Sequence, residues 1–166
     1  LTLLRDGATV EVSPYLDSGI TNEDSNWDDQ FWHTTAVQSQ GSRAFIEAHT
    51  LKTGFRTCTF MDAKLTLGGT DVSAEPEVRK EATLVEHIYK VEVPAGEPLV
   101  VYKYGGYTVD LNHAAEQLVE ASGKVLDLAL EKGFDALKEE QRKAWEEIWE
   151  MSDITIQGDV RAQQGI

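Results

Sequence analysis

The sequence is short of basic residues, and this shortage excludes two classes of partner. Its 15 lysines and arginines stand against 29 aspartates and glutamates, so the formal net charge is −14 and the isoelectric point is near 4.6. The basic residues are scattered and form no cluster along the chain. Binding to a nucleic acid or to an acidic membrane surface needs a basic patch, so we expect neither partner.

Cysteine and long apolar runs are also scarce. Cys58 is the one cysteine in the sequence, so no disulfide can form within the chain. It lies in the strand-like segment FRTCTF, which predicts a small buried side chain rather than a reactive thiol. No apolar run approaches the roughly 20 residues that cross a bilayer, and the first residues lack the pattern of a signal peptide. We therefore expect a reducing, cytoplasmic setting.

Both ends of the sequence have the features of a fragment. The chain begins at Leu1 without a methionine, and it stops in DVRAQQGI, where a helical pattern is just beginning. Its 166 residues are enough for one domain with a sizeable core. We expect a piece of a longer protein, lacking sequence at both ends.

The part of the chain before Asp110 predicts β-strands. Asp6-Gly7 is a hairpin signal between residues 1–5 and 8–12. Longer strands are predicted over residues 43–51, 55–67, 82–93 and 98–104. In the third of these, alternate residues predict an inward face: Val85, His87, Tyr89, Val91 and Val93. Strands joined by tight turns without helices between them favour stacked antiparallel sheets.

After Asp110 the apolar period changes to that of a helix. The predicted face of the first helix comprises Ala115, Leu118, Val119, Ser122, Val125, Leu126 and Ala129. Asp110 or Asn112 is the predicted cap, Gly105-Gly106 the break before the helix, and Gly133 its end. A second helix is predicted over residues 135–151, packed antiparallel to the first. Its apolar stripe comprises Phe134, Leu137, Trp145, Ile148 and Trp149.

These patterns predict a mainly β fold with C-terminal helices, in which an antiparallel β-sandwich is followed by an antiparallel helix pair. Residues 1–109 form the sandwich part, and residues 110–152 form linker helices. A short strand over 153–157 and a helix cap at Asp159 complete the chain.

Residues 21–32, TNEDSNWDDQFW, are unusually rich in carboxylates and aromatic rings. Asp24, Asn26 and Asp28 have the spacing of a calcium loop, but Asp29 stands where that loop needs glycine and Thr35 where it needs glutamate. A carboxylate pair for sugar hydrolysis would need an acid of raised pKa, which a polar run does not favour. We expect a turn whose Asn and Asp side chains bond their own backbone, with Trp27, Phe31 and Trp32 as packing anchors.

Other motifs carry little chemistry. The four histidines, His33, His49, His87 and His113, have no metal-binding spacing and predict separate structural roles. Trp145 and Trp149, four residues apart, could stack on a sugar ring, but their helical spacing favours packing in a core. We find no catalytic motif and expect no catalytic residue, no metal site and no cofactor in this chain.

Two stretches of about twenty residues carry a resemblance to a known family. The segment AWEEIWEMSDITIQGDVRAQQGI resembles the join between the N-terminal β-sandwich and the (α/α)6 barrel of glycoside hydrolase family 65, the disaccharide phosphorylases. The pairing of PYLDSGITNEDSNWDDQFW with TLKTGFRTCTF and VVYKYGGY is most similar to the members that act on maltose. On this resemblance residues 1–109 are the later part of the sandwich and residues 110–152 are its linker helices. Residues 153–166 are then the start of the barrel.

The resemblance implies a reaction for the parent protein. Such enzymes cleave a disaccharide with inorganic phosphate as co-substrate and invert the anomeric carbon, and the general acid, a Glu, belongs to the barrel. A second carboxylate is not needed because it would repel the phosphate nucleophile. The family implies a homodimer and a scaffold role for this part. Within it, Asn22, Asp24, Trp27 and Asp28 are the residues that we expect to lie near the substrate.

Two other functions stay open from the sequence. The chain could be a stand-alone carbohydrate-binding sandwich, for which a row of exposed aromatic residues on one sheet would be the sign. It could also be an interaction or oligomerisation module. Within the family, phosphorylases of trehalose, kojibiose and nigerose share the architecture, so the disaccharide itself is not fixed.

Overall fold

The computed structural model describes residues 1–21, 30–154, 156–158 and 160–163. The chain divides into two compact units, Leu1–Leu128 and Ala129–Ile166. The first unit contains two β-sheets and most of helix α1 (Leu118–Lys132). The second contains the end of that helix, α2 (Phe134–Ser152) and the short α3 (Val160–Gln163).

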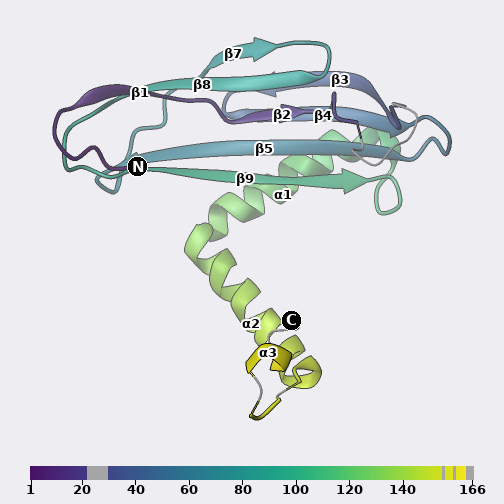
Figure 1. Cartoon of the computed structure of the whole chain (residues 1–166). Helices are drawn as coiled ribbons and strands as arrows, with labels where there is room; N and C mark the ends of the chain where they lie inside the picture. The colour runs from purple at the N-terminus through teal and green to yellow at the C-terminus, as the bar shows by residue number, and fades with distance from the viewer. Residues whose placement is uncertain (22–29, 155, 159, 164–166) are drawn as a thin grey trace. The chain divides into compact units, whose positions relative to one another are not determined.

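All strand pairs in the first unit are antiparallel. The larger sheet has five strands: β3 (Trp32–Gln40), β4 (Arg43–Thr50), β5 (Arg56–Leu67), β6 (Thr70–Asp71) and β9 (Leu99–Val109). Its order is β3-β4-β5-β6, and β9 pairs with β5 along its other side. The smaller sheet is built around β8 (Leu84–Val93), which pairs with β1 (Ala8–Val12), β2 (Tyr15–Asp17) and β7 (Glu77–Lys80). Figure 1 shows β8 and its partners as a layer above β5 and β9. The predicted antiparallel sandwich is confirmed.

The core between the sheets follows the period-two pattern of β8. Val85, His87, Tyr89 and Val93 are buried, as predicted for this face, and Val91 is partly buried against them. From the larger sheet, the side chains that meet this face are Ala44, Ile46, Met61, Ala63 and Leu65. Each of these apolar side chains leaves water on folding, which is the main force that holds the two layers together.

Helix α1 covers the outer face of the larger sheet. Leu118 and Leu126 pack on Phe45, Cys58 and Phe60. The predicted helical face is therefore correct at its centre, although Val125 is exposed. A buried hydrogen bond joins the two layers, because the Oγ atoms of Thr108 on β9 and Ser122 on α1 lie 2.9 Å apart.

An ion pair also joins α1 to the sheet. Arg43 on β4 donates from Nε to the buried carboxylate of Asp62 at 3.1 Å, and from Nη2 to Asp127 on α1 at 2.7 Å. The carboxylate of Asp127, more than Asp62, raises the pKa of the Arg43 guanidinium. The side chain of Arg43 thus links α1, β4 and β5.

Strand β3 contains a bulge. Its register against β4 shifts between Thr34 and Ala36, so one extra residue stands in β3. The hydroxyl of that residue, Thr35, donates to the carbonyl of Glu47 at 3.1 Å.

Several predicted boundaries were wrong. Residues 1–5 form no hairpin with β1; instead Thr2 makes a single bridge to Pro98, and β1 pairs with β8. Gly105-Gly106 does not break the chain but lies inside β9. A Cβ at Gly106 would lie 2.9 Å from the ring of Phe60, so glycine lets the two strands approach across that ring.

The predicted helix cap was also wrong. The residue at the N-cap position is Ala114, ahead of a 3-10 turn at Ala115–Gln117, and it makes no side-chain cap bond. Asp110 instead accepts a hydrogen bond from the backbone of Arg56 at 3.1 Å. Of residues 153–157, the four that the structure describes are not in a strand, so the strand predicted there is not found.

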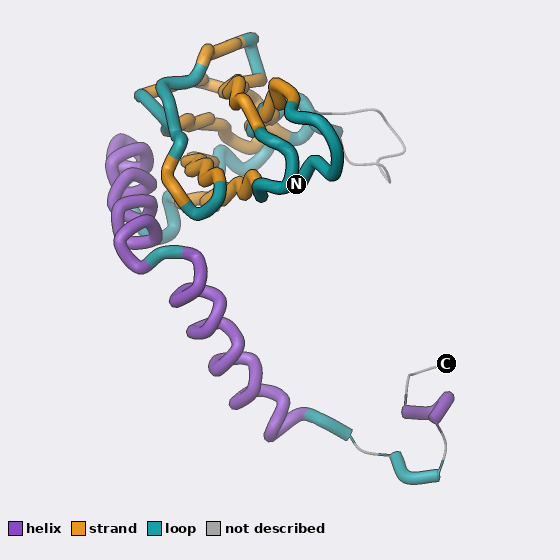
Figure 2. Tube along the Cα trace, turned by 90° about the vertical axis from the view of Figure 1, so that its left-hand side faces the viewer, coloured by secondary structure: helices purple, strands orange, loops and turns teal. Residues whose placement is uncertain are grey.

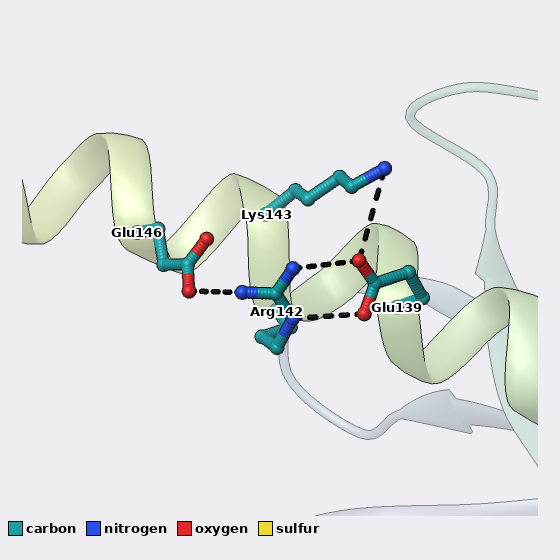
Figure 3. A network of polar contacts seen from close by, with 4 residues as sticks. All are labelled: Glu139, Arg142, Lys143 and Glu146. Carbon is teal, nitrogen blue, oxygen red and sulfur yellow. Dashed lines mark hydrogen bonds and ion pairs between the residues drawn. The ribbon is translucent and has the colours of Figure 1, made fainter.

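In the second unit, α2 begins one residue earlier than predicted, directly after Gly133, which has a φ of 77°. Charged side chains on its surface are linked as in Figure 3: Arg142 forks onto Glu139 with bonds of 2.6 and 2.8 Å and also contacts Glu146. Lys143 pairs with the same Glu139. The antiparallel packing of α1 and α2 stays a prediction.

Candidate functional site

A cavity opens at one end of the sandwich, in the first unit. Its volume is about 510 Å³. It lies between the end of β2 and the inner face of the larger sheet. Its walls are mainly apolar, and they are formed by Leu16, Asp17, Ser18, Ile20, Trp32, Ile46, Ala48, Phe55, Thr57, Thr59, Tyr107 and Val109. Such a concave apolar space is the usual form of a binding site for a small ligand.

Aromatic side chains from three parts of the sheet line this cavity. Trp32 begins β3 and Phe55 stands just before β5, and their ring centroids are 6.3 Å apart in a tilted arrangement. Tyr107, on β9, is 74% exposed. The alternation along each strand turns these residues to the inner face. Rings of this kind can stack on the apolar face of a sugar or cover an apolar side chain.

Two polar side chains of the cavity wall, Ser18 and Asp17, form hydrogen bonds within the protein. The Oγ atoms of Ser18 and Thr34 lie 2.7 Å apart, and Ser18 also donates to the carbonyl of Thr83 at 3.2 Å. Asp17 is the one carboxylate in the described wall, and it accepts a hydrogen bond from the backbone of Gly19 at 2.8 Å. Glycoside hydrolysis ordinarily needs a pair of carboxylates, and the described wall supplies one.

The predicted substrate-proximal residues, Asn22, Asp24, Trp27 and Asp28, lie outside the described residues. The chain on both sides of them reaches the cavity, since Ile20 and Trp32 are both in its wall. The prediction that Trp32 is a packing anchor is confirmed by its contact with Phe55. Phe31 is 40% exposed, so its side chain anchors the stretch less well than expected.

Two histidines that are far apart in sequence meet in the structure. His33 and His49 are directly opposed on β3 and β4, with ring centroids 5.2 Å apart. No local motif indicated this pair, because it depends on the register of two strands. Over the ranges that the structure covers, no third His, Cys, Asp or Glu joins them in a metal-binding group.

His87 and Cys58 are two of the buried groups with ionisable side chains that the sequence singled out. The Nε2 atom of His87 lies 2.9 Å from the Oγ of Ser39, and burial lowers the pKa of this histidine. Burial raises the pKa of the Cys58 thiol to about 11. The thiol is thus neutral near pH 7, as expected for a structural cysteine rather than a nucleophile.

Trp145 and Trp149 were predicted to pack in a core. Their rings stack with centroids 6.2 Å apart, and the two side chains are 49% and 55% exposed. Ile148 on the same helix is also about half exposed. Within the described structure this stripe is therefore a surface feature. None of the helices placed by the structure is long and apolar enough to cross a membrane.

The sequence is similar to two phosphorylases of known function over nearly its full length. It is 28% identical to the maltose phosphorylase of Bacillus subtilis (strain 168) over 163 residues, which is 98% of this chain and 21% of that protein. It is 25% identical to the alpha,alpha-trehalose phosphorylase of Thermoanaerobacter brockii over 155 residues, which is 93% of this chain and 20% of that protein. The chain thus spans about a fifth of the length of these relatives.

The fold is also found in a solved structure. A human microbiome protein described as a candidate kojibiose phosphorylase superposes with a TM-score of 0.79 at 21% identity, over 96% of this chain and 20% of that one. The profile of the glycosyl hydrolase family 65 N-terminal domain matches residues 1–148, which is most of the chain. The chain belongs to glycosyl hydrolase family 65, and residues 1–148 match the N-terminal domain of that family.

Proposed function

We propose that the chain is the non-catalytic sandwich and linker portion of a disaccharide phosphorylase, with maltose as the favoured substrate. The observation that carries the proposal is the similarity to a maltose phosphorylase across 98% of the chain. In the proposed reaction, maltose and phosphate give glucose and β-glucose 1-phosphate with inversion. The groups that perform this chemistry belong to the part of the parent protein outside residues 1–166.

The charges of the described residues support a scaffold role. A general acid needs a raised pKa, whereas hydrogen bonds lower the pKa of three carboxyl groups here: Ser73 acts on Asp71, Lys124 on Glu120, and Arg142 on Glu139. A phosphate site needs cations that are free to donate. Arg43 and Arg142 are instead both engaged by carboxylates of the chain.

The test is a phosphorolysis assay on the full-length protein. We expect phosphate-dependent release of glucose from maltose, with β-glucose 1-phosphate identified by proton NMR. Trehalose, kojibiose and nigerose are the comparison substrates, and faster turnover of any of them would transfer the proposal to that disaccharide. The isolated chain is the control, and turnover by it would contradict the assignment of the chemistry to the remainder of the protein.

We further propose that the stretch containing Asn22, Asp24, Trp27 and Asp28 lies near the substrate in the parent enzyme. Its density of hydrogen-bond acceptors and aromatic rings supports this assignment. So does the presence in the cavity wall of Ile20 and Trp32, which precede and follow the stretch in the sequence. In the full-length enzyme, Trp27→Ala and Asp28→Ala should change KM or kcat for the disaccharide. The exposed aspartate Asp6 provides the control, since Asp6→Ala should leave both constants unchanged. Unchanged constants in the first two variants would refute the proposal.

A second candidate function is saccharide binding by the cavity itself. The observation that favours it is the set of aromatic rings, above all the exposed Tyr107, around an open space of about 510 Å³. Calorimetric titration of the chain with maltose tests it. Heat that disappears in Tyr107→Ala would support binding, and no heat at millimolar maltose would rule it out.

We also propose a cytoplasmic homodimer as the state of the parent protein. The single buried cysteine supports a reducing compartment. Light scattering of the full-length protein should give twice the mass of one chain, and a monomer mass would contradict the dimer.

A further inference from the structure

Strand β9 forms one edge of the five-stranded sheet. Its register with β5 is unbroken from Thr57–Val109 to Leu67–Leu99. Among the described strands, none pairs along the other side of β9. Successive residues of an antiparallel strand turn their N–H and C=O groups to alternate sides. The N–H of Leu99 points to the open side, where it donates to Leu1, so the groups on that side belong to Val101, Lys103, Gly105, Tyr107 and Val109.

This edge lacks the usual protection. Natural sheets blunt their edges with bulges, prolines or outward charges, because an open row of N–H and C=O groups recruits another strand. The opposite edge of the sheet, β3, has the bulge at Thr35. Strand β9 has no register shift and no proline. Its one charged residue, Lys103, donates to the carbonyl of Tyr15 at 2.8 Å, so its ammonium group lies against the other sheet and not at the edge.

The first residues of the chain already pair with the start of this edge. Leu1 donates to the carbonyl of Leu99 at 2.9 Å and accepts from the N–H of Leu99 at 2.8 Å. Thr2 forms an antiparallel bridge with Pro98, and Leu3 accepts from Gly96 at 2.8 Å. Figure 1 marks the N-terminus beside the beginning of β9. Because the two segments run in opposite directions, an extended chain that arrives at Leu1 would run along the open edge.

We propose that the open edge of β9 is a strand-addition site whose occupant is the segment joined directly to Leu1 in the full-length protein. The inference rests on the proposed function, since it takes the chain as part of a longer phosphorylase. Leu1 lies opposite Leu99, which fixes the register. Each residue further upstream lies opposite the next residue of β9, so the third residue before Leu1 is opposite Tyr102. The added segment becomes the sixth strand of the larger sheet, and its backbone pairs with the open N–H and C=O groups of β9.

The register can be tested by a disulfide in the full-length protein. Tyr102→Cys is combined with cysteine at the third residue before Leu1. Tyr102 turns its own N–H and C=O toward β5, so this is a non-hydrogen-bonded pair, for which the Cα atoms lie about 4.5 Å apart and within the range of a disulfide. The native Cys58 is buried and does not compete. The matched control keeps Tyr102→Cys and places the other cysteine at the fourth residue before Leu1, where the side chain turns to the opposite face.

The proposal predicts an intrachain disulfide between Tyr102→Cys and the cysteine at the third residue before Leu1 under mild oxidation. The yield of this disulfide should be at least about tenfold higher than in the control. Equal yields, or no disulfide in either pair, would overturn it. A disulfide between two molecules would also overturn it, because the edge would then be occupied by a second copy.

Amide hydrogen exchange tests the same edge without substitution, in case Tyr102→Cys does not fold. The amides of Val101, Lys103, Gly105 and Tyr107 should exchange at least about tenfold more slowly in the full-length protein than in a chain that starts at Leu1. Amides of the even-numbered residues, which face β5, provide the internal control. The phosphorolysis assay on the same preparation separates the two proposals, since a formed disulfide without turnover would refute the function and leave the strand in place.

Discussion

The packing of α1 on the larger sheet gives a prediction whose size follows from the burial of two leucines. Leu126 is 1% exposed and packs against Phe45, Cys58 and Phe60. Leu128, two residues further along the same helix, is 61% exposed. The same substitution to alanine at these two positions removes the same atoms, so any difference reports the contact with the sheet and not helix propensity.

The expected magnitudes differ severalfold. Leu126→Ala removes three buried carbon groups at about 0.8 kcal/mol each, which is about 2.4 kcal/mol. The space left behind adds about 1 kcal/mol, because a cavity costs about 24 cal/mol per Å³ and collapse is incomplete. We therefore expect a loss of about 3 to 4 kcal/mol in the free energy of unfolding. Leu128→Ala loses only the covered part of its side chain, which is about 1 kcal/mol or less.

The assay is urea unfolding of the three chains, followed by the strand signal in far-ultraviolet circular dichroism. For a chain of this size the change at Leu126 corresponds to about 6 to 16 °C in Tm, at about 2 to 4 °C per kcal/mol. The m-value should stay the same in all three, since the folded and unfolded surfaces barely change. Equal losses for Leu126→Ala and Leu128→Ala, or no loss for either, would show that α1 is not docked through this face.

Three further predictions concern single residues of the first unit. Burial lowers the pKa of His87, so the unfolded chain binds a proton at this side chain more readily than the folded chain does. The contribution of His87 to the free energy of unfolding is therefore complete above pH about 6.5 and falls as the pH decreases below that value. His87→Gln should make this fall smaller in urea titrations between pH 7.5 and 5.5. With the pKa of its thiol at about 11, Cys58 should not react with a disulfide reagent at pH 8 in the folded chain, but should react within minutes in urea; reaction in the folded state would contradict its burial. Gly106→Ala should lower the free energy of unfolding by about 1 to 3 kcal/mol, because its Cβ would lie 2.9 Å from the ring of Phe60. Gly123→Ala, in open space on α1, should raise that free energy by about 0.5 to 1 kcal/mol. Changes of the same sign for both variants in thermal unfolding would refute the close approach.

The long strands and helix α1 could be predicted from the sequence because their burial repeats along the chain. The alternation in β8 placed Val85 and Tyr89 correctly on the inner face, and the helical period placed Leu118 and Leu126 on the sheet. These elements each bury one face, so their apolar residues must recur at the period of the element.

The errors occurred where contacts distant in sequence outweigh local signals. Asp6-Gly7 is a local hairpin signal, yet β1 pairs with β8, far along the chain. The double glycine in β9 suggested a break, whereas Gly106 serves the packing of Phe60 on the neighbouring strand. Asp110 is of a residue type that often caps helices, but its carboxylate accepts a hydrogen bond from the backbone N–H of Arg56. Each of these depends on a partner that no local pattern shows.

The candidate site was predicted less well than the fold. The cavity forms from β2, β3, β4, β5 and β9, and its walls exist only when their registers are fixed. The histidine pair, His33 and His49, has the same origin. The aromatic residue Trp32 could be singled out from composition, but its partner Phe55 could not.

The extra residue at Thr35 decides which side chains of β3 face the interior. On one side of it, Trp32 and Thr34 are opposite Thr50 and Ala48, and on the other side Val37 is opposite Ile46. Even-numbered residues therefore face the cavity before the insertion, and odd-numbered residues face the core after it, although a regular strand would keep one parity throughout. Deleting Thr35 would remove one of two adjacent threonines, so β3 would still contain the same kinds of amino acid. The indole of Trp32 would nevertheless turn outward. In this strand, the exact number of residues is a stricter requirement for the fold than the amino-acid composition.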